Sequence, residues 1–464
     1  MFMNPLLSPL WPFIATTVET GTETEIAPLV LAGVLLSLVV VYFASKLGGE
    51  VCLRLNLPPV LGELVGGVLV GVSALKLLLF PEGGLAPEDS LIIQLLMGSA
   101  DLSPEAAQSV FSAQSEVISV ISELGVIILL FEIGLESNLK ELIRVGPQAA
   151  IVAVVGVVTP FSLGTIGLMT IFGVAPIPAI FAGAALTATS IGITAKVLAE
   201  INRLSSNEGQ IIIGAAVLDD ILGIIVLAVV GSLVKTGEIQ ISNIIYLILS
   251  ATGFVVGSIL IGRLLSPFYV SLVNRMKTRG QLLLVSICVA FVLSYIAQIV
   301  QLEAILGSFA AGLILAETEK REELEEQILP LADFFVPVFF VCVGAKTDVS
   351  VLNPAVPANR EGLIIAAFLI LVAIVGKVVT GFTLVGNSEL NKLAIGVGMI
   401  PRGEVGLVFA GVGAASGALD PATDAAIIVM VIVTTFVAPP WLRAVFEGKK
   451  KEEVPQKNLP TPEQ

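Results

Sequence analysis

The sequence predicts an all-α, polytopic membrane protein with about thirteen transmembrane helices. Its 464 residues are 56% hydrophobic and only 13% charged, and the mean hydropathy is +0.99. A soluble domain carries roughly 25% charged residues, so this composition excludes an ordinary soluble protein. Apolar stretches long enough to cross a bilayer recur along the chain, and the 44 glycines suit membrane helices that approach one another closely.

Thirteen apolar segments make up a predicted transmembrane domain at residues 27–445, with ends defined to within several residues. Residues 1–26 are predicted to form a tail with an interfacial stretch at 5–14, and residues 446–464 a disordered tail. The segments are 27–45, 58–80, 116–138, 146–173, 177–201, 207–234, 240–265, 280–299, 302–317, 328–346, 361–385, 391–418 and 421–445.

Lysine and arginine residues gather on one side of these segments. The opposite side has only Lys76, Lys235, Lys346 and Arg360. Cytoplasmic loops carry an excess of these residues, so the basic side is predicted to face the cytoplasm. With an odd number of spans, the N-terminus is expected outside and the C-terminal tail in the cytoplasm.

Two adjacent carboxylates, Asp219 and Asp220, lie in the middle of the apolar segment 207–234. A carboxylate at bilayer depth costs roughly 2.5–3.5 kcal/mol on insertion scales, and such residues usually line an ion or proton path. Adjacent helical residues point about 100° apart, so the two cannot face one small site in the same way. The alternative is a helix that dips into the interface and leaves both aspartates in water. The isoleucine-rich flanks at 211–213 and 224–225 argue against it.

Lys377 is the lysine that lies well inside a predicted span, in the segment 361–385. A buried ammonium must pair with a carboxylate or lose its proton. One of the two central aspartates is the natural partner. The alternative is a side chain that extends along the helix until its charge reaches the interface.

Two segments contain helix breakers in mid-span. Residues 186–194 carry a cluster of hydroxyls and a glycine, and residues 401–406 hold one proline and two glycines around the charged pair Arg402 and Glu404. If segments one to six and eight to thirteen form two units, each broken segment is the fifth of its unit. This pattern is typical of inverted repeats whose discontinuous helices meet at a transport site, although kinks without a site remain an alternative.

The ends of half-helices carry partial charges of either sign, and these must be compensated where they meet inside the membrane. Arg402 and Glu404 are therefore predicted to act as crossing-point charges. Three glutamates, Glu63, Glu132 and Glu136, lie nearer the ends of spans and are predicted to have structural or access-path roles.

The cysteines Cys52, Cys288 and Cys342 have neither metal-site nor disulfide spacing, and the sequence contains no histidine. Any response to pH must therefore come from carboxylates or lysines.

Several motifs together resemble the monovalent cation:proton antiporter-2 family, in the branch of NapA-type Na⁺/H⁺ antiporters. They are residues 187–194 (TATSIGIT), 214–220 (GAAVLDD), Gly376-Lys377 and 399–406 (MIPRGEVG). The resemblance covers nearly the whole chain and is strongest to cyanobacterial Na⁺/H⁺ antiporters.

The resemblance implies an NhaA/NapA-like fold, a homodimer, and a plasma or thylakoid membrane location if the protein is cyanobacterial. It also implies a dimerisation part at about 27–138 and 280–346, a core part at about 146–234 and 361–445, and a linker helix at about 240–265.

The resemblance also implies residue roles. Asp220 matches the cation-binding aspartate, here for Na⁺, and Asp219 the aspartate that pairs with the membrane lysine, Lys377. Thr189 and Ser190 match the unwound stretch beside the site. A pair of aspartates with a lysine resembles the electrogenic type.

The expected function is exchange of Na⁺, with Li⁺ or K⁺ as other candidates, for H⁺ by alternating access, in the service of pH and salt homeostasis. No cofactor and no nucleic-acid partner are expected. The alternatives on the same fold are a K⁺/H⁺ antiporter, a cation symporter and a cation efflux channel. An intramembrane aspartyl protease would need two aspartates from different helices, and a purely structural protein would leave three buried ionisable residues unexplained.

Overall fold

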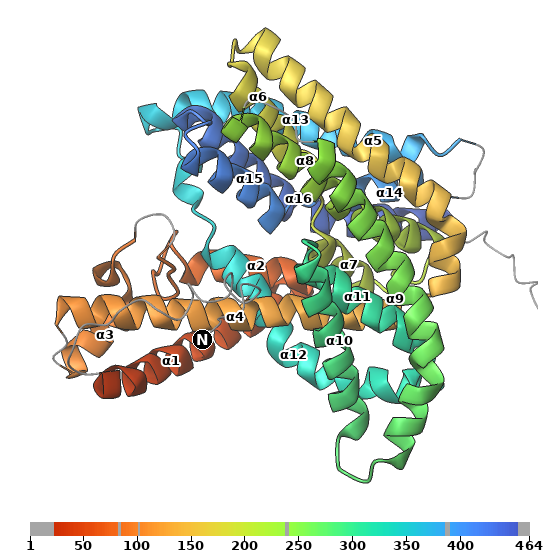
Figure 1. The fold of residues 1–464 in the computed structure, drawn as a ribbon. Coiled ribbons are helices and arrows are strands. Elements are labelled where there is room, and N and C mark those ends of the chain that lie inside the picture. The colour runs from red at the N-terminus through yellow and green to blue at the C-terminus, as the bar shows by residue number, and fades with distance from the viewer. Residues whose placement is uncertain (1–22, 82–84, 101–102, 237–240, 386–389, 453–464) are drawn as a thin grey trace, which may run out of the picture.

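The computed structural model describes residues 23–81, 85–100, 103–236, 241–385 and 390–452, and it places them in sixteen α-helices and two short 3-10 turns (Figure 1). The predicted all-α class is confirmed. The predicted interfacial stretch at 5–14 and the last twelve residues of the predicted tail, 453–464, lie outside these described residues.

Among the described residues, nine helices are long and apolar enough to cross a bilayer. They are α1 (Glu23–Arg54), α4 (Pro104–Glu136), α5 (Leu139–Ile171), α8 (Asn207–Thr236), α9 (Ile241–Arg275), α10 (Gln281–Ile299), α12 (Arg321–Ala345), α13 (Pro357–Phe382) and α16 (Pro421–Glu452).

The shorter helices complete the count. They are α2 (Pro59–Val70), α3 (Leu91–Ala100), α6 (Pro176–Ala185), α7 (Ile191–Glu200), α11 (Ala304–Ala316), α14 (Lys392–Gly398) and α15 (Glu404–Ala415). The pairs α6–α7 and α14–α15 are each one interrupted segment. Together with α2, α11 and the nine long helices they account for the thirteen predicted segments, while α3 lies in the loop after the second.

The helices form two units with the same order of lengths. In each unit the second helix is short, with 12 residues in α2 and 13 in α11, and the fifth is interrupted. The first unit runs from α1 to α8 and the second from α10 to α16, with α9 between them. This correspondence fits the predicted pair of inverted repeats.

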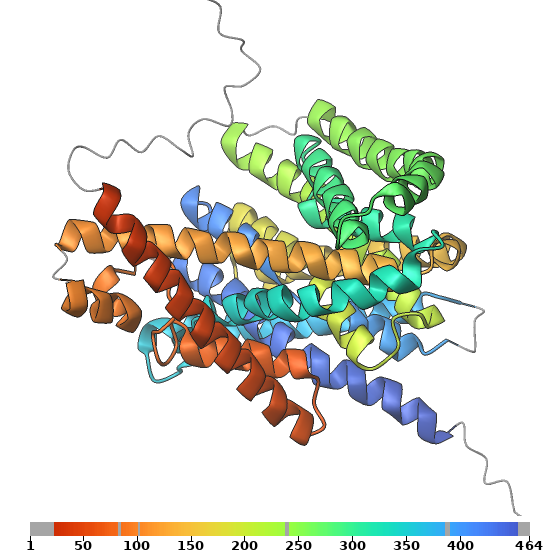
Figure 2. The same ribbon diagram turned by 90° about the horizontal axis from the view of Figure 1, so that it is seen from below.

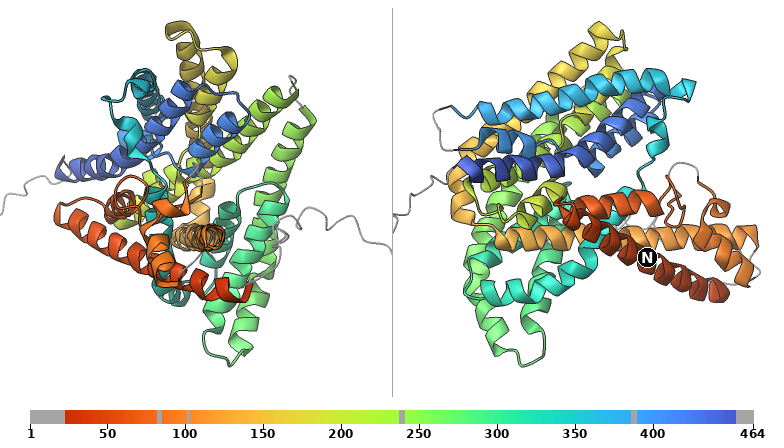
Figure 3. Two further views of the ribbon diagram at one scale, coloured as in Figure 1. Left: turned by 90° about the vertical axis from the view of Figure 1, so that its left-hand side faces the viewer. Right: turned by 180° about the vertical axis from the view of Figure 1, so that it is seen from behind.

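The helices pack as two bundles, one above the other in Figure 1 and again separate when seen from behind in the right-hand view of Figure 3. The first bundle contains α1, α2, α4, α10, α11 and α12. The second contains α5 to α8 and α13 to α16. Helix α9 contacts both α8 and α11, and with α10 it forms the green hairpin that projects to one side in Figure 2. A dimerisation role for the first bundle and a moving role for the second stay predictions.

Contacts between helix termini define two ends of the bundles. At one end, Arg321 donates a hydrogen bond to the carbonyl oxygen of Glu136 over 3.0 Å, and Arg144 donates to Asn207 over 2.9 Å. At the other end, Ser73 donates to the carbonyl oxygen of Thr347 over 2.6 Å. We call the first the basic end, because many lysines and arginines lie at helix ends there. They include Arg54, Lys140, Arg144, Arg203, Lys320 and Arg321.

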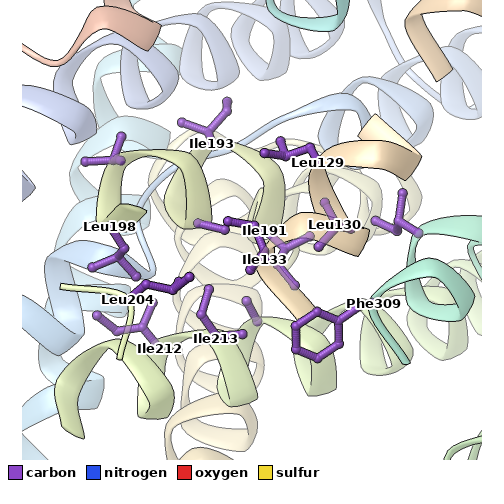
Figure 4. Packing of buried hydrophobic residues seen from close by; sticks show 14 of the residues in the cluster. Leu129, Leu130, Ile133, Ile191, Ile193, Leu198, Leu204, Ile212, Ile213 and Phe309 are labelled. Atoms are coloured by element: carbon purple, nitrogen blue, oxygen red, sulfur yellow. The ribbon is translucent and has the colours of Figure 1, made fainter. Parts of the chain in front are cut away.

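Figure 4 shows the apolar side chains around α7, the second half of the first broken segment. Ile191 of α7 lies beside Leu130 and Ile133 of α4, and all three are buried. Ile212 and Ile213 of α8 are buried in the same cluster. Helix α7 of the second bundle therefore packs against α4 of the first bundle on one side and against its neighbour α8 on the other.

Candidate functional site

The two broken segments meet at their breaks. The first break covers residues 186–190, between α6 and α7, and the second covers 399–403, between α14 and α15. The backbone N–H of Ser190 donates to the carbonyl oxygen of Pro401 over 2.8 Å. Non-helical backbone inside a membrane is tolerated where it is buried in protein or lines a cavity. These buried breaks, which satisfy one another, meet that condition.

Thr189 and Ser190 use their hydroxyls differently. The Thr189 hydroxyl donates to the carbonyl oxygen of Met399 over 3.1 Å, so it ties the two breaks together. The Oγ of Ser190 is buried without a hydrogen-bond partner among the described residues. A Cβ at Gly403 would lie 2.8 Å from that Oγ, so a larger residue at this position would displace the Ser190 side chain. Ser190 therefore offers an oxygen that could bind a cation.

Arg402 lies fully buried at the crossing. Its guanidinium donates to the carbonyl oxygens of Thr187, over 3.1 Å, and of Ala188. These carbonyls follow the end of α6, where a helix carries partial negative charge. Arg402 thus has the geometry that a crossing-point charge needs. Glu404 is the first residue of α15, and its side chain lies outside the described part of the structure.

Replacing Arg402 with alanine is expected to destabilise the protein strongly, because the carbonyls of Thr187 and Ala188 would lose their donor. A buried polar group without a partner costs about 1–3 kcal/mol. The thermal melting temperature in detergent measures the effect. The matched control is Arg443→Ala, which removes an ion pair at the surface with Glu447 that is worth about 0–1 kcal/mol. Equal losses of stability in the two variants would contradict the role given to Arg402.

Asp219 and Lys377 form a buried ion pair. The Nζ of Lys377, on α13, donates to Oδ2 of Asp219, on α8, over 2.9 Å, and both side chains are 0% exposed. A Cβ at Gly156 of α5 would lie 3.2 Å from the same Nζ, so α5 closes over the lysine. The side chain of Lys377 therefore does not reach the surface.

Asp220 is 3% exposed and lies next to Asp219 on α8, about 100° around the helix. A Cβ at Gly223, one turn further along α8, would lie 3.9 Å from Ala188 in the first break. Helix α8 thus carries the two aspartates past the crossing of the broken segments. The arrangement joins a buried carboxylate pair, a lysine and an arginine with the oxygens of two interrupted helices.

The family described as "Sodium/hydrogen exchanger, transmembrane" matches residues 34–448. The chain belongs to this family. The high-affinity Na⁺/H⁺ antiporter NhaS3 of Synechocystis is 96% identical over 463 residues, which cover 100% of both chains. The Na⁺/H⁺-K⁺ antiporter GerN of Bacillus cereus is 29% identical over 89% of this chain and 96% of its own.

A similar fold is found in the sodium proton antiporter MjNhaP1 of Methanocaldococcus jannaschii. The match has a TM-score of 0.59 at 16% identity and covers 92% of this chain and 99% of that one. At this identity the likeness concerns the fold alone. The predicted family is confirmed, and so is a secondary transporter rather than an enzyme, since the relatives of the exchanger family are named as antiporters.

The three glutamates predicted for an access path lie in the first bundle, Glu63 on α2 and both Glu132 and Glu136 on α4. Their charges act on Lys196 of α7 rather than on the aspartate pair. The sequence reasoning did not single out Lys196 or its neighbour Glu200. Their spacing of four residues within an apolar segment was the available signal.

The oxygens near the crossing suit a monovalent cation as a passing substrate. Among the residues that the structure describes, no group of three or more His, Cys, Asp and Glu side chains could hold a metal ion. A Na⁺ ion at Asp220 would therefore complete its shell with hydroxyl or carbonyl oxygens, which hard cations accept. Ser190 and Thr189 carry hydroxyls beside the crossing, as do Thr187 and Thr194.

Proposed function

We propose that the protein exchanges Na⁺ for H⁺ by alternating access, and that Asp220 is the residue that binds either ion. The observation that carries this proposal is the buried Asp219–Lys377 pair beside the crossing of two broken helices. Charged groups at membrane depth are costly and usually mark ion or proton paths. The 96% identical relative, named as a high-affinity Na⁺/H⁺ antiporter, supports the same assignment.

Exchange follows from competition for one carboxylate. Asp220 in its charged form attracts Na⁺, and the oxygens of Ser190 and Thr189 replace part of the water that the ion loses. A proton on Asp220 removes the charge that holds the ion, so Na⁺ and H⁺ cannot occupy the residue together. If the protein exposes the site to one side at a time, each movement of Na⁺ is matched by a counter-movement of H⁺.

The ion pair between Asp219 and Lys377 provides a second group that can exchange a proton. Breaking and reforming it in each cycle would couple more than one proton to each Na⁺, so we propose that the exchange is electrogenic. Arg402 lies close enough for its charge to act on both members of the pair. It stays with the crossing and does not itself exchange protons.

For the wider organisation we propose that the basic end faces the cytoplasm, since lysine and arginine favour that side. The second bundle, which holds the site, would then move against the first bundle. We further propose that the first bundle forms the contact of a homodimer. Cross-linking of single cysteines on α1 tests the dimer, and protease access to the C-terminal tail in oriented vesicles tests the orientation.

Purified protein in liposomes with a trapped pH-sensitive dye tests the exchange. With an inside-acidic gradient, external Na⁺ is expected to drive protons out, and Li⁺ and K⁺ added in turn give the selectivity. The K⁺ arm matters because one relative is named as a Na⁺/H⁺-K⁺ antiporter. Liposomes without protein are the control. Movement of Na⁺ without counter-movement of protons would indicate a channel and contradict the proposal.

A further inference from the structure

Lys196 lies where the two bundles touch at the basic end. Its helix, α7, contacts α2 and α4 of the first bundle on one side and α8 and α16 of the second on the other. The side chain is half-buried, and the charges of four glutamates act on it. Three of them, Glu63, Glu132 and Glu136, belong to the first bundle. Only Glu200 shares α7 with the lysine.

None of these glutamates forms a direct ion pair with Lys196 within 4.0 Å in the described part of the chain. Glu63, Glu132 and Glu200 each have one buried carboxylate oxygen without a hydrogen-bond partner there. Glu132 is only 8% exposed, so little water reaches its carboxylate. Burial disfavours the charged form of each of these carboxylates, and the ammonium of Lys196 is the nearby charge that opposes this effect most strongly.

Other charges around the cluster do not replace the lysine. Lys46 acts on Glu63 from α1, Arg443 on Glu200 from α16, and Arg321 on Glu136 from α12, whereas Glu325 and Asp333 of α12 add negative charge. Within the part of the chain that the structure describes, Lys196 is the one cation whose charge acts on all four glutamates. It is also the one of these cations that lies on the interrupted segment of the proposed ion path.

A direct hydrogen bond crosses the same boundary. The backbone N–H of Val60, in the first turn of α2, donates to Oε1 of Glu200, at the last residue of α7, over 3.2 Å. Beyond it, the apolar contacts between α7 and α4 in Figure 4 fill the interface. The two bundles are therefore closed against each other at the basic end.

Toward the opposite end, the bundles enclose a cavity of about 200 Å³. Leu64 and Thr347 line it on the side of the first bundle, and Thr435 and Gly403 on the side of the second. Gly403 touches Ser190 at the crossing, as described above. The ion site is thus approached by a cavity from this end and sealed at the end where Lys196 lies.

We propose that Lys196 is a positioning residue for transport, whose charge holds α7 against Glu63 and Glu132 and so keeps the basic end of the ion path closed. The proposal rests on the exchange proposed above. When the second bundle moves to open the basic end, Lys196 leaves the glutamates of the first bundle and water reaches them. The charge attraction therefore favours the closed state and sets part of the balance between the two states.

The variant Val60→Cys can report this opening. Val60, in the first turn of α2, is 0% exposed, and its backbone N–H meets Glu200 of α7 across the boundary. The native Cys52 is replaced, because the residues that line the hollow around it belong to the first bundle. In a Cys52→Ser, Cys288→Ser, Cys342→Ala background, the rate at which a small maleimide labels the Val60→Cys protein measures how often the basic end opens.

Lys196→Gln is expected to raise the labelling rate of the Val60→Cys protein by about fivefold or more, the factor that a modest change in a two-state balance produces. Glu63→Gln with Glu132→Gln removes the partners on the first bundle and is expected to raise the rate as well. Combining all three changes should give much less than the product of the two effects, since each removes the same interaction. Lys196→Arg should restore the rate of the parent protein.

Lys140→Gln is the matched control, because it removes an exposed lysine at the same end without touching the cluster. Melting curves establish that each variant is folded, and if Lys196→Gln is not, the double glutamate variant decides alone. An unchanged labelling rate, or effects that simply multiply, would overturn the proposal. The labelling does not depend on transport, so a parent protein that fails to exchange Na⁺ for H⁺ refutes the proposed function, whereas unchanged labelling refutes only the role of Lys196.

Discussion

Asp220→Asn is expected to abolish Na⁺-driven proton movement and to reduce it to the level of liposomes without protein. Asparagine has nearly the same size as aspartate and keeps an oxygen that can face a cation, but it has no charge and accepts no proton. Asp220 is 3% exposed, so water cannot stabilise a cation there in place of the lost carboxylate charge. Both halves of the exchange depend on that charge, and both should fail together.

The variant should nevertheless insert and fold. Burying a charged carboxylate carries a desolvation cost, and a neutral group of the same shape avoids that cost. Its melting temperature is therefore expected to equal or exceed that of the parent protein. Asp89→Asn is the matched control, since it makes the same chemical change in an exposed ion pair with Lys76 and should leave transport intact. Near-normal exchange by a folded Asp220→Asn protein would remove Asp220 from the ion path.

The sequence predicted the crossing of the broken helices and the buried charges beside it. Charged residues and helix breakers stand out inside apolar segments, and burying them in a membrane costs much free energy. Charged residues and helix breakers in apolar segments are unfavourable unless they meet one another. An aspartate of the central pair could therefore be expected to pair with Lys377, and the resemblance to the antiporter family indicated Asp219, 158 positions away. The Oδ2 of Asp219 and the Nζ of Lys377 lie 2.9 Å apart. The crossing of the breaks at 186–190 and 399–403 followed from the same reasoning.

The extent of an apolar segment predicted the ends of helices less well, because apolar residues indicate burial and not a helical backbone. The predicted segment 58–80 continues far past α2, which ends at Val70. Leu78, Leu79 and Phe80 are buried but lie outside any helix. In the opposite direction, α16 runs on to Glu452, six residues beyond its own last apolar residue, Phe446, so the prediction of a disordered tail was wrong for residues 446–452. A helix needs backbone hydrogen bonds, which a lysine-rich stretch also supports.

The cluster around Lys196 could not be assembled from the sequence. Each member lies near the end of its segment, where a charged residue has an ordinary explanation at the membrane surface. Lys196 is therefore one of the many basic residues on the predicted cytoplasmic side, and beyond its spacing from Glu200 nothing in the sequence sets it apart from the others. Its relation to Glu63 and Glu132 depends on how α7 packs between α2 and α4, which is a tertiary contact without a local signal.

Lys377→Ala is expected to destabilise the protein by about 3–5 kcal/mol, the usual loss when one partner of a buried ion pair is removed. The reason is that Asp219 would remain in a site with 0% exposure without the ammonium that compensates it. The melting temperature of the variant in one detergent, compared with that of the parent protein, measures the loss. Lys392→Ala, a lysine at the first residue of α14 that is not fully buried, is the control and should melt like the parent.

The double variant Lys377→Ala, Asp219→Asn is expected to recover part of that loss. It removes both charges, so the penalty of the orphaned carboxylate disappears even though the pair is gone. Parent, both single variants and the double variant form a cycle that isolates the coupling between the two residues. In liposomes the double variant should also shift the exchange toward one proton per Na⁺, because Asp220 is then the remaining group that exchanges protons. A coupling near zero would show that the 2.9 Å contact does not stabilise the protein, and Asp220 would become the partner of Lys377 to test next.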